Sequence, residues 1–353
     1  MEAFANISLD DERYIARCLQ LARCGAGSTS PNPMVGAVVV CDGKIIGEGY
    51  HIRCGEAHAE VNAINSVRDR SLLSRSTIYV SLEPCSHYGK TPPCADLIIS
   101  CGIPRVVVAV TDNNSMVSGR GIERMRAAGI DVRVGVLAEQ SFRLNRAFFT
   151  FHGYARPFVT LKWAQSVDGF IDYNRTDGKA QIISSSRSAM AVHKLRSQCD
   201  AILVGRRTAL LDNPSLTLRH WSGRMPQRLV IDKNGTLPST LALFDGSVPT
   251  TVFTSVPTPC NRENLSYVQI DFSKNIPTQI LNYLATRNIG SLLVEGGRET
   301  LQGFIDAGLW DEIRIETNPR LYMHEGVSAP RLPQGVKTLT SCCFGHIIET
   351  IER

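Results

Sequence analysis

Two cysteines, Cys85 and Cys94, stand with eight residues between them in the stretch EPCSHYGKTPPC. Paired sulfurs of this kind can form a disulfide, pack as buried thiols or bind a metal. A metal site would need a further ligand, and catalytic zinc typically has three protein ligands and one open position. The best candidate for the third ligand is His58, in the motif His58-Ala-Glu60.

The expected positions of these residues favour a common metal site. His58 opens a predicted helix, and Glu60 can reach the same point as His58 if that point lies near the helix N-terminus. Prolines before Cys85 and Cys94 fit cysteines at or near helix starts, where the thiolate form is favoured. Two thiolates and one imidazole would neutralise Zn²⁺, which leaves a position for water and lowers its pKa.

Glu60 is the predicted general acid and base, which moves a proton from water to the ring nitrogen and the leaving amine. His-x-Glu followed by Pro-Cys-x-x-Cys is the signature of zinc deaminases. His58, Glu60 and the Pro84-Cys85 pair match it, but eight residues replace the usual two before the second cysteine. Cys54 is a rival ligand, although no carboxylate and no Pro-Cys pair accompanies it.

Composition narrows the class of protein. The 353 residues predict two domains, and no run is long and apolar enough for a membrane span. Eleven cysteines at irregular spacings argue against a disulfide framework. The acidic start, which has no signal-like stretch, indicates a cytoplasmic protein. The net charge of +5 is thinly spread, which suits anionic small molecules rather than nucleic acid.

The hydrophobic pattern predicts two α/β domains, residues 1–150 and 151–353. The first begins with an amphipathic helix over 9–24 and a hairpin over 34–50 that turns at Asp42-Gly43. Helices and buried strands then alternate in both halves, which indicates largely parallel sheets.

A glycine-rich turn in the second half, VEGGRETLQG, follows a predicted buried strand and opens a helix. Backbone N–H groups at such a helix start can bind phosphate. The pattern is not Gly-x-Gly-x-x-Gly, so a Rossmann domain is disfavoured. Taken alone, a Gly-Gly turn between a strand and a helix is often just a turn.

Together these motifs resemble a known family, the bifunctional deaminase–reductase of riboflavin biosynthesis. In the first half the resemblance rests on SPNPMVGAVVV, GEGYH, GEAHAEVNA and EPCSHYGKTPPC. In the second half it rests on LKWAQSVDGF, LRSQCDAILVGRRTALLDNPSLTLR and LLVEGGRETLQGFIDAGLWDE. The wide spacing between the cysteines is that family's own departure from other zinc deaminases. Lys90 stands where the family commonly has arginine.

For the first domain the resemblance implies a cytidine-deaminase-like three-layer fold. This domain would hydrolyse the 2-amino group of a diaminopyrimidinone ribosylamine 5′-phosphate. One Zn²⁺ per chain would be bound by His58, Cys85 and Cys94, with Glu60 as the proton shuttle. The resemblance places three further residues at the substrate: Asn32, His87 and Lys90.

For the second domain the resemblance implies a dihydrofolate-reductase-like α/β fold that passes hydride from NADPH to the ribose C1′, in a homodimeric protein. The matching cofactor positions are Ala164, Thr208, Asp212, Gly297, Arg298, Glu299, Thr300, Leu301, Gln302 and Gly303. The matching substrate positions are Lys179, Arg196, Leu216, Arg219 and Glu295. Charge and fork geometry make Arg196 and Arg219 candidate phosphate partners.

Two other functions fit parts of the sequence. One is a zinc deaminase acting on a nucleoside, nucleotide or tRNA, with an accessory second domain, but a tRNA enzyme would need a basic face with aromatic stacking. The other is a binding or scaffold protein with structural zinc, which would need a fourth protein ligand such as Cys54 or His87.

Overall fold

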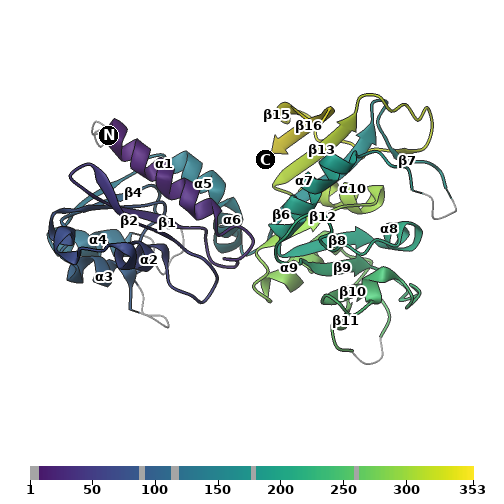
Figure 1. The fold of residues 1–353 in the computed structure, drawn as a ribbon. Coiled ribbons are helices and arrows are strands. Elements are labelled where there is room, and N and C mark those ends of the chain that lie inside the picture. Colours follow the sequence, from purple (N-terminus) through teal and green to yellow (C-terminus); the bar gives the residue numbers. More distant parts are fainter. Residues whose placement is uncertain (1–7, 87–91, 113–118, 176–179, 258–261) are drawn as a thin grey trace. The chain divides into compact units, whose positions relative to one another are not determined.

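The computed structural model describes residues 8–86, 92–112, 119–175, 180–257 and 262–353. The chain divides into two compact units, Met1–Ala155 and Arg156–Arg353, which are drawn in Figure 1. The predicted boundary at 150 lies inside α6 (Arg146–Tyr154), a helix that belongs wholly to the first unit. Each unit has its own sheet and its own core.

The first unit is built on a five-stranded sheet in the order β2-β1-β3-β4-β5. The predicted hairpin is confirmed: β1 and β2 are antiparallel, and Asp42 and Gly43 between them both have positive φ, as a tight hairpin turn requires. Strand β1 also pairs antiparallel with β3, whereas β3 with β4 and β4 with β5 run parallel. The strands are β1 (Gly36–Cys41), β2 (Lys44–Tyr50), β3 (Thr77–Val80), β4 (Arg105–Val108) and β5 (Asp131–Val134).

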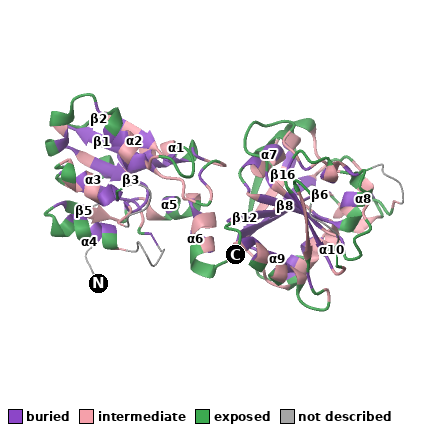
Figure 2. Cartoon of the chain, turned by 90° about the horizontal axis from the view of Figure 1, so that it is seen from below, coloured by how far each residue is buried: buried purple, intermediate pink, exposed green. Residues whose placement is uncertain are grey.

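Helices cover both faces of this sheet, so the expected three layers are present. Buried residues of α1 and a partly buried residue of α5 pack on one face, and buried residues of α2, α3 and α4 pack on the other. Figure 2 shows the buried strands between less buried helices. The helices are α1 (Leu9–Arg23), α2 (Ala59–Ser66), α3 (Cys94–Ser100), α4 (Arg120–Ala127) and α5 (Ala138–Leu144), with a short 3₁₀ helix at Arg70–Arg75.

The second unit contains a nine-stranded sheet in the order β11-β10-β9-β8-β12-β6-β13-β16-β15. Strands from β11 to β13 in this order are parallel, whereas β16 and β15 form an antiparallel C-terminal hairpin that the sequence analysis did not predict. The strands are β6 (Phe158–Ser166), β8 (Ala201–Gly205), β9 (Gln227–Ile231), β10 (Thr250–Thr254), β11 (Leu265–Gln269), β12 (Ser291–Val294), β13 (Glu312–Asn318), β15 (Thr338–Cys343) and β16 (His346–Glu352). A separate pair joins β7 (Phe170–Asp172) and β14 (Val327–Ser328).

Helices again cover both faces of the sheet. One core cluster includes Leu281 and Phe304 from α9 and α10, and the opposite cluster includes Leu195 and Ala209 from α7 and α8. The helices are α7 (Ser186–Ser197), α8 (Arg206–Asp212), α9 (Ile276–Ala285) and α10 (Arg298–Asp306), with a 3₁₀ turn at Ala242–Phe244. This α/β arrangement is the one expected for the second domain.

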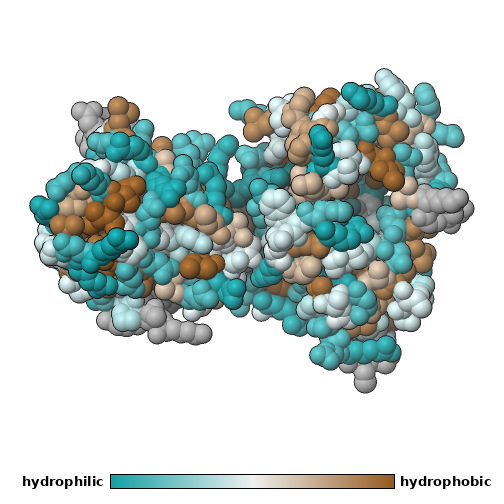
Figure 3. Space-filling view, viewed as in Figure 1, coloured by the Kyte–Doolittle hydropathy of each residue, from teal (hydrophilic) through white to brown (hydrophobic). Residues whose placement is uncertain are grey.

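Hydrophilic residues make up much of the surface of each unit. Figure 3 shows hydrophilic side chains over the visible faces of both units, interspersed with smaller apolar groups. Among the described residues, no helix combines the length and the apolar character that a membrane crossing requires.

A buried carboxylate joins α1 to the sheet of the first unit. Asp11 is 1% exposed, and its oxygens accept hydrogen bonds from Arg105 at 2.9 Å, Arg133 at 3.2 Å and Tyr79 at 3.0 Å. Burial acts to raise the pKa of Asp11, but the hydrogen bonds and positive charges outweigh it and lower this pKa. The helix is therefore held to β3, β4 and β5 by one ionised group.

Replacing Asp11→Asn should lower the stability of the first unit by about 3 kcal/mol, because two arginines would lose a buried counter-charge. A carboxylate with a lowered folded pKa stabilises fully above its unfolded value near 4 and loses this effect as pH falls. The difference between wild type and variant should therefore shrink below about pH 4. Hydrogen exchange of the β4 amides measures this unit alone, whereas tryptophan fluorescence would not report on it, because all three tryptophans lie in the second unit.

The matched control is Asp10→Asn. Asp10 is exposed and lies 3.6 Å from Arg13, so its loss should change stability by less than about 0.5 kcal/mol. Equal effects of the two substitutions would contradict a special role for the buried carboxylate.

Candidate active sites

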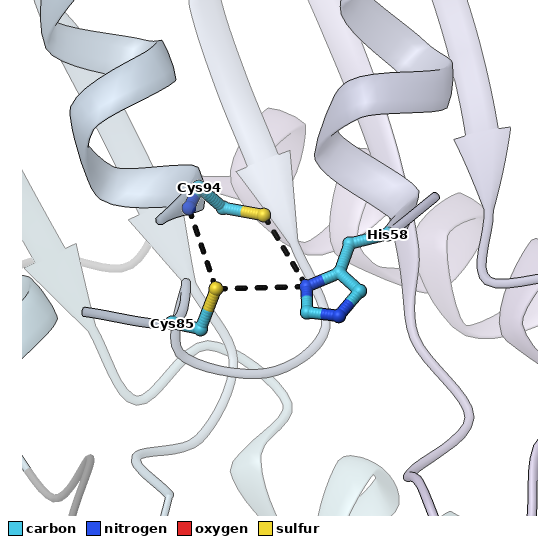
Figure 4. Close-up of side chains that lie close together, drawn as sticks. All are labelled: His58, Cys85 and Cys94. Carbon is cyan, nitrogen blue, oxygen red and sulfur yellow. Dashed lines mark hydrogen bonds between the residues drawn. The ribbon is translucent and has the colours of Figure 1, made fainter. Parts of the chain in front are cut away.

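Three ligand atoms meet where two helices of the first unit begin. His58 is the N-cap residue of α2, Cys94 is the first residue of α3, and Cys85 lies in the loop that follows β3. Figure 4 shows the imidazole and both sulfurs turned toward one another. His58 Nδ1 lies 3.5 Å from Cys85 Sγ and 3.4 Å from Cys94 Sγ. The predicted ligands are thus brought together by the fold.

The spacing of the ligand atoms fits zinc. A tetrahedral ion with ordinary Zn–S and Zn–N bonds separates its sulfur and nitrogen ligands by about 3.6 Å. The two observed S···N distances, 3.5 and 3.4 Å, are close to this value, and the three ligand atoms lie within 4.8 Å of one another. Within the described ranges, no fourth His, Cys, Asp or Glu joins this group.

The rival ligand Cys54 is exposed and does not belong to the group. His87, the other candidate for a fourth ligand, lies outside the described residues, as does Lys90. The three-ligand arrangement leaves room for a water molecule, as catalytic zinc sites do.

The surroundings of Cys85 differ from one expectation. Its proline was expected to mark a helix start, but residues 83–86 form an irregular loop. The helix N-terminus that stabilises its thiolate belongs to α3 instead, because the backbone N–H of Cys94 donates to Cys85 Sγ at 3.3 Å. Hydrogen bonds from Cys94 and His58 lower the pKa of Cys85 to about 4.

The same hydrogen bonds act in the opposite direction on the donors. The Cys85 thiolate raises the pKa of His58 to about 9, and it also raises the pKa of the Cys94 thiol. Protons held by His58 and Cys94 are therefore the ones that a metal ion must displace.

Glu60 lies in the first turn of α2 and is 3% exposed. Burial, followed by the charge of Cys85, raises the pKa of Glu60 to about 7. A carboxyl group with this pKa can both accept and donate a proton near neutral pH.

Two glycines of β2, Gly47 and Gly49, allow α2 to lie directly on the sheet. A Cβ at Gly49 would come within 2.3 Å of Ala63 N.

A cavity of about 280 Å³ adjoins His58, Glu60 and Cys85, and Asn32 lines it as predicted. His51, which the sequence analysis missed, orients Asn32. His51 Nδ1 donates to Ala57 O at 3.1 Å, so His51 Nε2 accepts from the Asn32 amide at 3.2 Å. The amide oxygen of Asn32 is therefore the group available to accept a hydrogen bond from a bound ring.

Glu83 is a second residue that sequence reasoning missed. Its carboxylate accepts backbone hydrogen bonds from Gly119 and Gly121 at 3.0 Å and from Asp112 at 3.2 Å. It thereby fixes the start of α4 against the loop that carries Cys85. A Cβ at Gly121 would lie 2.2 Å from Pro84 O, so glycine is needed for this approach.

The second unit has a larger cavity, of about 1010 Å³, near the carboxyl ends of β6, β8, β9 and β12. Ligands of parallel α/β sheets bind at this edge. The predicted residues that line it are Ala164, Arg196, Thr208, Asp212, Glu295, Gly297, Arg298, Glu299, Thr300 and Leu301.

Four predicted residues of this unit that the structure describes do not line the cavity. Gln302 and Gly303 lie farther along α10, Leu216 is buried in the core, and Arg219 is exposed. Lys179 lies outside the described residues. The structure adds Lys162 of β6 to the wall, where it pairs with Glu316 at 3.3 Å.

Two helix N-termini border this cavity, those of α8 and α10. Their N-cap residues, Gly205 and Gly297, have no side-chain cap, so backbone N–H groups remain for a ligand. A Cβ at Gly205 would lie 2.4 Å from Thr300 Oγ1, so glycine lets the two helix starts approach. Arg298 Nε is buried without a hydrogen-bond partner among the described residues. These features fit an anionic cofactor such as a dinucleotide.

Arg196 differs from its expected role. Its Nε and Nη2 donate to Glu295 at 2.8 and 2.6 Å, so the fork expected to bind phosphate is engaged by a carboxylate. Burial acts to raise the pKa of Glu295, but the charge of Arg196 outweighs it and lowers this pKa. Asp212 is likewise paired, with Arg175.

Two family models match the chain. The first is described as the cytidine and deoxycytidylate deaminase zinc-binding region and matches residues 8–110. The second, the RibD C-terminal domain, matches residues 157–340. The zinc-binding model contains His58, Glu60, Cys85 and Cys94, and the other contains the large cavity.

Relatives that match about nine-tenths of the chain agree with both family models. Riboflavin biosynthesis protein RibD of Aquifex aeolicus is 42% identical over 90% of this chain and 89% of its own length. RibD of Bacillus amyloliquefaciens is 40% identical over 92% and 88%.

A solved structure from Thermotoga maritima has a TM-score of 0.89 and 36% identity, covering 97% of this chain and 98% of its own. That protein is a diaminohydroxyphosphoribosylaminopyrimidine deaminase and 5-amino-6-(5-phosphoribosylamino)uracil reductase. With its His-Cys-Cys zinc site and its reductase fold, the chain belongs to the RibD family of bifunctional deaminase–reductases of riboflavin biosynthesis.

Proposed function

We propose that the first unit removes the 2-amino group of a diaminopyrimidinone ribosylamine 5′-phosphate by hydrolysis, and that the second unit reduces the ribosyl group to ribityl with NADPH. The observation that carries the first half is the convergence of His58, Cys85 and Cys94 beside the buried Glu60. Named substrates of the Thermotoga protein support the choice of a phosphorylated pyrimidine.

In the deaminase unit, His58, Cys85 and Cys94 would hold the zinc ion. When bound, zinc supplies the Lewis acidity that makes water nucleophilic at neutral pH. Glu60 would accept one proton from that water and pass it to the ring nitrogen of the pyrimidine, and would then accept the second proton of the water and pass it to the amino group, which leaves as ammonia. Asn32, held by His51, accepts a hydrogen bond from the ring and so orients it.

In the reductase unit, the two uncapped helix starts and Arg298 would hold the diphosphate of the dinucleotide. When bound, NADPH supplies the hydride that reduces C1′ of the ribose. The paired Arg196 and Glu295 form one wall of the same cavity, where they can contact the sugar. The expected role of Arg219 is to bind the 5′-phosphate.

A nucleotide or tRNA deaminase with an accessory second domain is the weaker alternative, because the RibD model matches the second unit itself. A homodimer, implied by the resemblance, and a cytoplasmic location, indicated by the N-terminal sequence, stay predictions. Each of the ten cysteines among the described residues has a free thiol, which fits a reducing compartment.

Full-length protein loaded with zinc should release ammonia from the diamino substrate without NADPH and then oxidise NADPH when it is added. Glu60→Ala should lower ammonia release by at least about 10²-fold, because the proton shuttle is lost. Zinc content should stay at one ion per chain, since Glu60 is not a ligand. Reduction of pre-deaminated substrate should also survive.

Glu56→Ala is the matched control, because Glu56 is exposed and does not line the deaminase cavity. Loss of both activities in Glu60→Ala, or loss of its zinc, would contradict the assignment of two separate sites.

Zinc binding should release about two protons per chain at pH 7, one from His58 and one from Cys94, because both have raised pKa values. The apparent dissociation constant should rise by up to about 100-fold from pH 7 to pH 6, since each proton contributes up to tenfold. Calorimetry of zinc binding in buffers with different ionisation enthalpies counts the protons.

Cys54→Ser should release the same number of protons as wild type if Cys54 is not a ligand. Proton release near zero in wild type would show that the ligands are already deprotonated, against the hydrogen-bonded arrangement described above.

Arg298→Met should weaken NADPH binding by about tenfold, because a charge-assisted hydrogen bond to the cofactor would be lost. Fluorescence titration of NADPH measures this affinity, and ammonia release should be unchanged. Arg287→Met serves as control, because Arg287 stacks on Tyr283 away from the cavity. Unaltered NADPH affinity in Arg298→Met would remove Arg298 from the cofactor site.

A further inference from the structure

His193 is a buried histidine in the second unit to which neither the motifs nor the cavity wall gives a role. It lies on α7, one turn before Arg196, and is 4% exposed. Its Nδ1 lies 3.2 Å from the backbone nitrogen of Arg219. This hydrogen bond therefore connects Arg219, 26 positions away in sequence, to the helix that carries Arg196.

The direction of this hydrogen bond is fixed by chemistry. A backbone N–H can only donate, so Nδ1 must accept and the ring proton must sit on Nε2. Burial, followed by the charges of Arg196, His220 and Arg219, lowers the pKa of His193 to about 4. The ring is therefore neutral at physiological pH and keeps its acceptor.

Other contacts hold the rest of the loop that leads to Arg219. The Leu216 side chain is 2% exposed in the core, and Ser215 O accepts a hydrogen bond at 3.3 Å from the buried Arg228. After Arg219, the Lys194 ammonium lies 5.2 Å from the centre of the Trp221 ring. His193 contacts the backbone of Arg219 itself, between these anchors.

The charges around His193 connect this hydrogen bond to the binding of an anion. The charges of Arg196 and Arg219 both contribute to the lowered pKa of His193. Arg196 is paired with Glu295, whereas no ion pair among the described residues involves Arg219. Arg219 is therefore the cation of the two that can take a phosphate as its partner.

We propose that His193 is a positioning residue for recognition of the substrate 5′-phosphate, because its hydrogen bond fixes the backbone of Arg219 beside α7. This inference rests on the proposed role of Arg219. It gives His193 no contact with the substrate, so its loss should act through binding of the phosphate rather than through hydride transfer.

Three substitutions separate the hydrogen bond from packing. His193→Leu removes the acceptor, His193→Asn places an amide oxygen near the position of Nδ1, and His193→Gln places its amide nearer to Nε2. In full-length protein with NADPH, His193→Leu and His193→Gln should raise KM for the deaminated ribosylamine 5′-phosphate about five- to tenfold. The value of kcat should change less than about twofold, and His193→Asn should stay within about twofold of wild type.

The same assay with substrate that lacks the phosphate isolates the cause. His193→Leu should not raise KM for that substrate, because Arg219 then has no phosphate to bind. His193→Asn and His193→Gln should have the same affinity for NADPH as each other, and the same thermal midpoint. If His193→Leu does not fold, the comparison of Asn with Gln still tests the proposal.

His220→Ala is the matched control, since His220 is exposed and its ring meets His193 edge-on at 4.9 Å without an acceptor role. It should leave KM unchanged, and an equal rise in KM would overturn the hydrogen-bond account.

Arg219→Met tells the two possible failures apart. If it keeps the full preference for phosphorylated substrate, the proposed role of Arg219 is wrong and the inference falls with it. If Arg219→Met loses that preference while His193→Leu and His193→Gln keep it, the inference about His193 alone is overturned.

Discussion

The imidazole of His58 and the sulfurs of Cys85 and Cys94 converge because α2 and α3 begin at the same edge of one sheet. Two sulfurs and one imidazole nitrogen at this separation share protons through hydrogen bonds unless a cation lies between them. The backbone N–H of Cys94 already stabilises the thiolate of Cys85. The helix starts therefore define both the position and the charge of the metal site, and Glu60 is fixed beside it by the same turn of α2.

The supporting residues around this site act at a distance from the metal. Glu83 joins the Cys85 loop to the start of α4 through backbone hydrogen bonds, and His51 orients Asn32. Asp11 secures α1 to β4 and β5 from the other side of the sheet. Each of these is a buried polar group with its partners satisfied, so loss of one leaves another group unpaired.

The second unit differs from the first, because its proposed ligands are large anions and its cavity is wide. It offers uncapped helix starts at Gly205 and Gly297 and a buried Arg298 Nε without a partner. Several cations of the cavity wall are already paired, Arg196 with Glu295 and Lys162 with Glu316. The charges left for ligands are therefore fewer than the number of basic residues suggests.

The sequence predicted the features that short motifs mark. The ligands His58, Cys85 and Cys94, the hairpin turn at Asp42-Gly43 and the helix after the Gly-Gly turn were all read correctly from short motifs. Contacts that no motif marks could not be read in this way. The Arg196–Glu295 pair spans 99 positions, and the acceptor role of Glu83 depends on backbone groups about 36 positions later.

The same limit explains the errors. A proline before Cys85 suggested a helix start, but the segment is held by contacts from α3 and α4 rather than by its own helix. The C-terminal hairpin was missed because its outer strand, β15, is mostly exposed and lacks a buried apolar run.

X-ray absorption at the zinc edge of the full-length, zinc-loaded protein tests the open three-ligand site most directly. The account predicts two sulfur neighbours at about 2.3 Å and two nitrogen or oxygen neighbours at about 2.0 Å, with a spectrum that Cys54→Ser leaves unchanged. A third sulfur neighbour that disappears in Cys54→Ser would contradict it, because the zinc site would then be closed by protein.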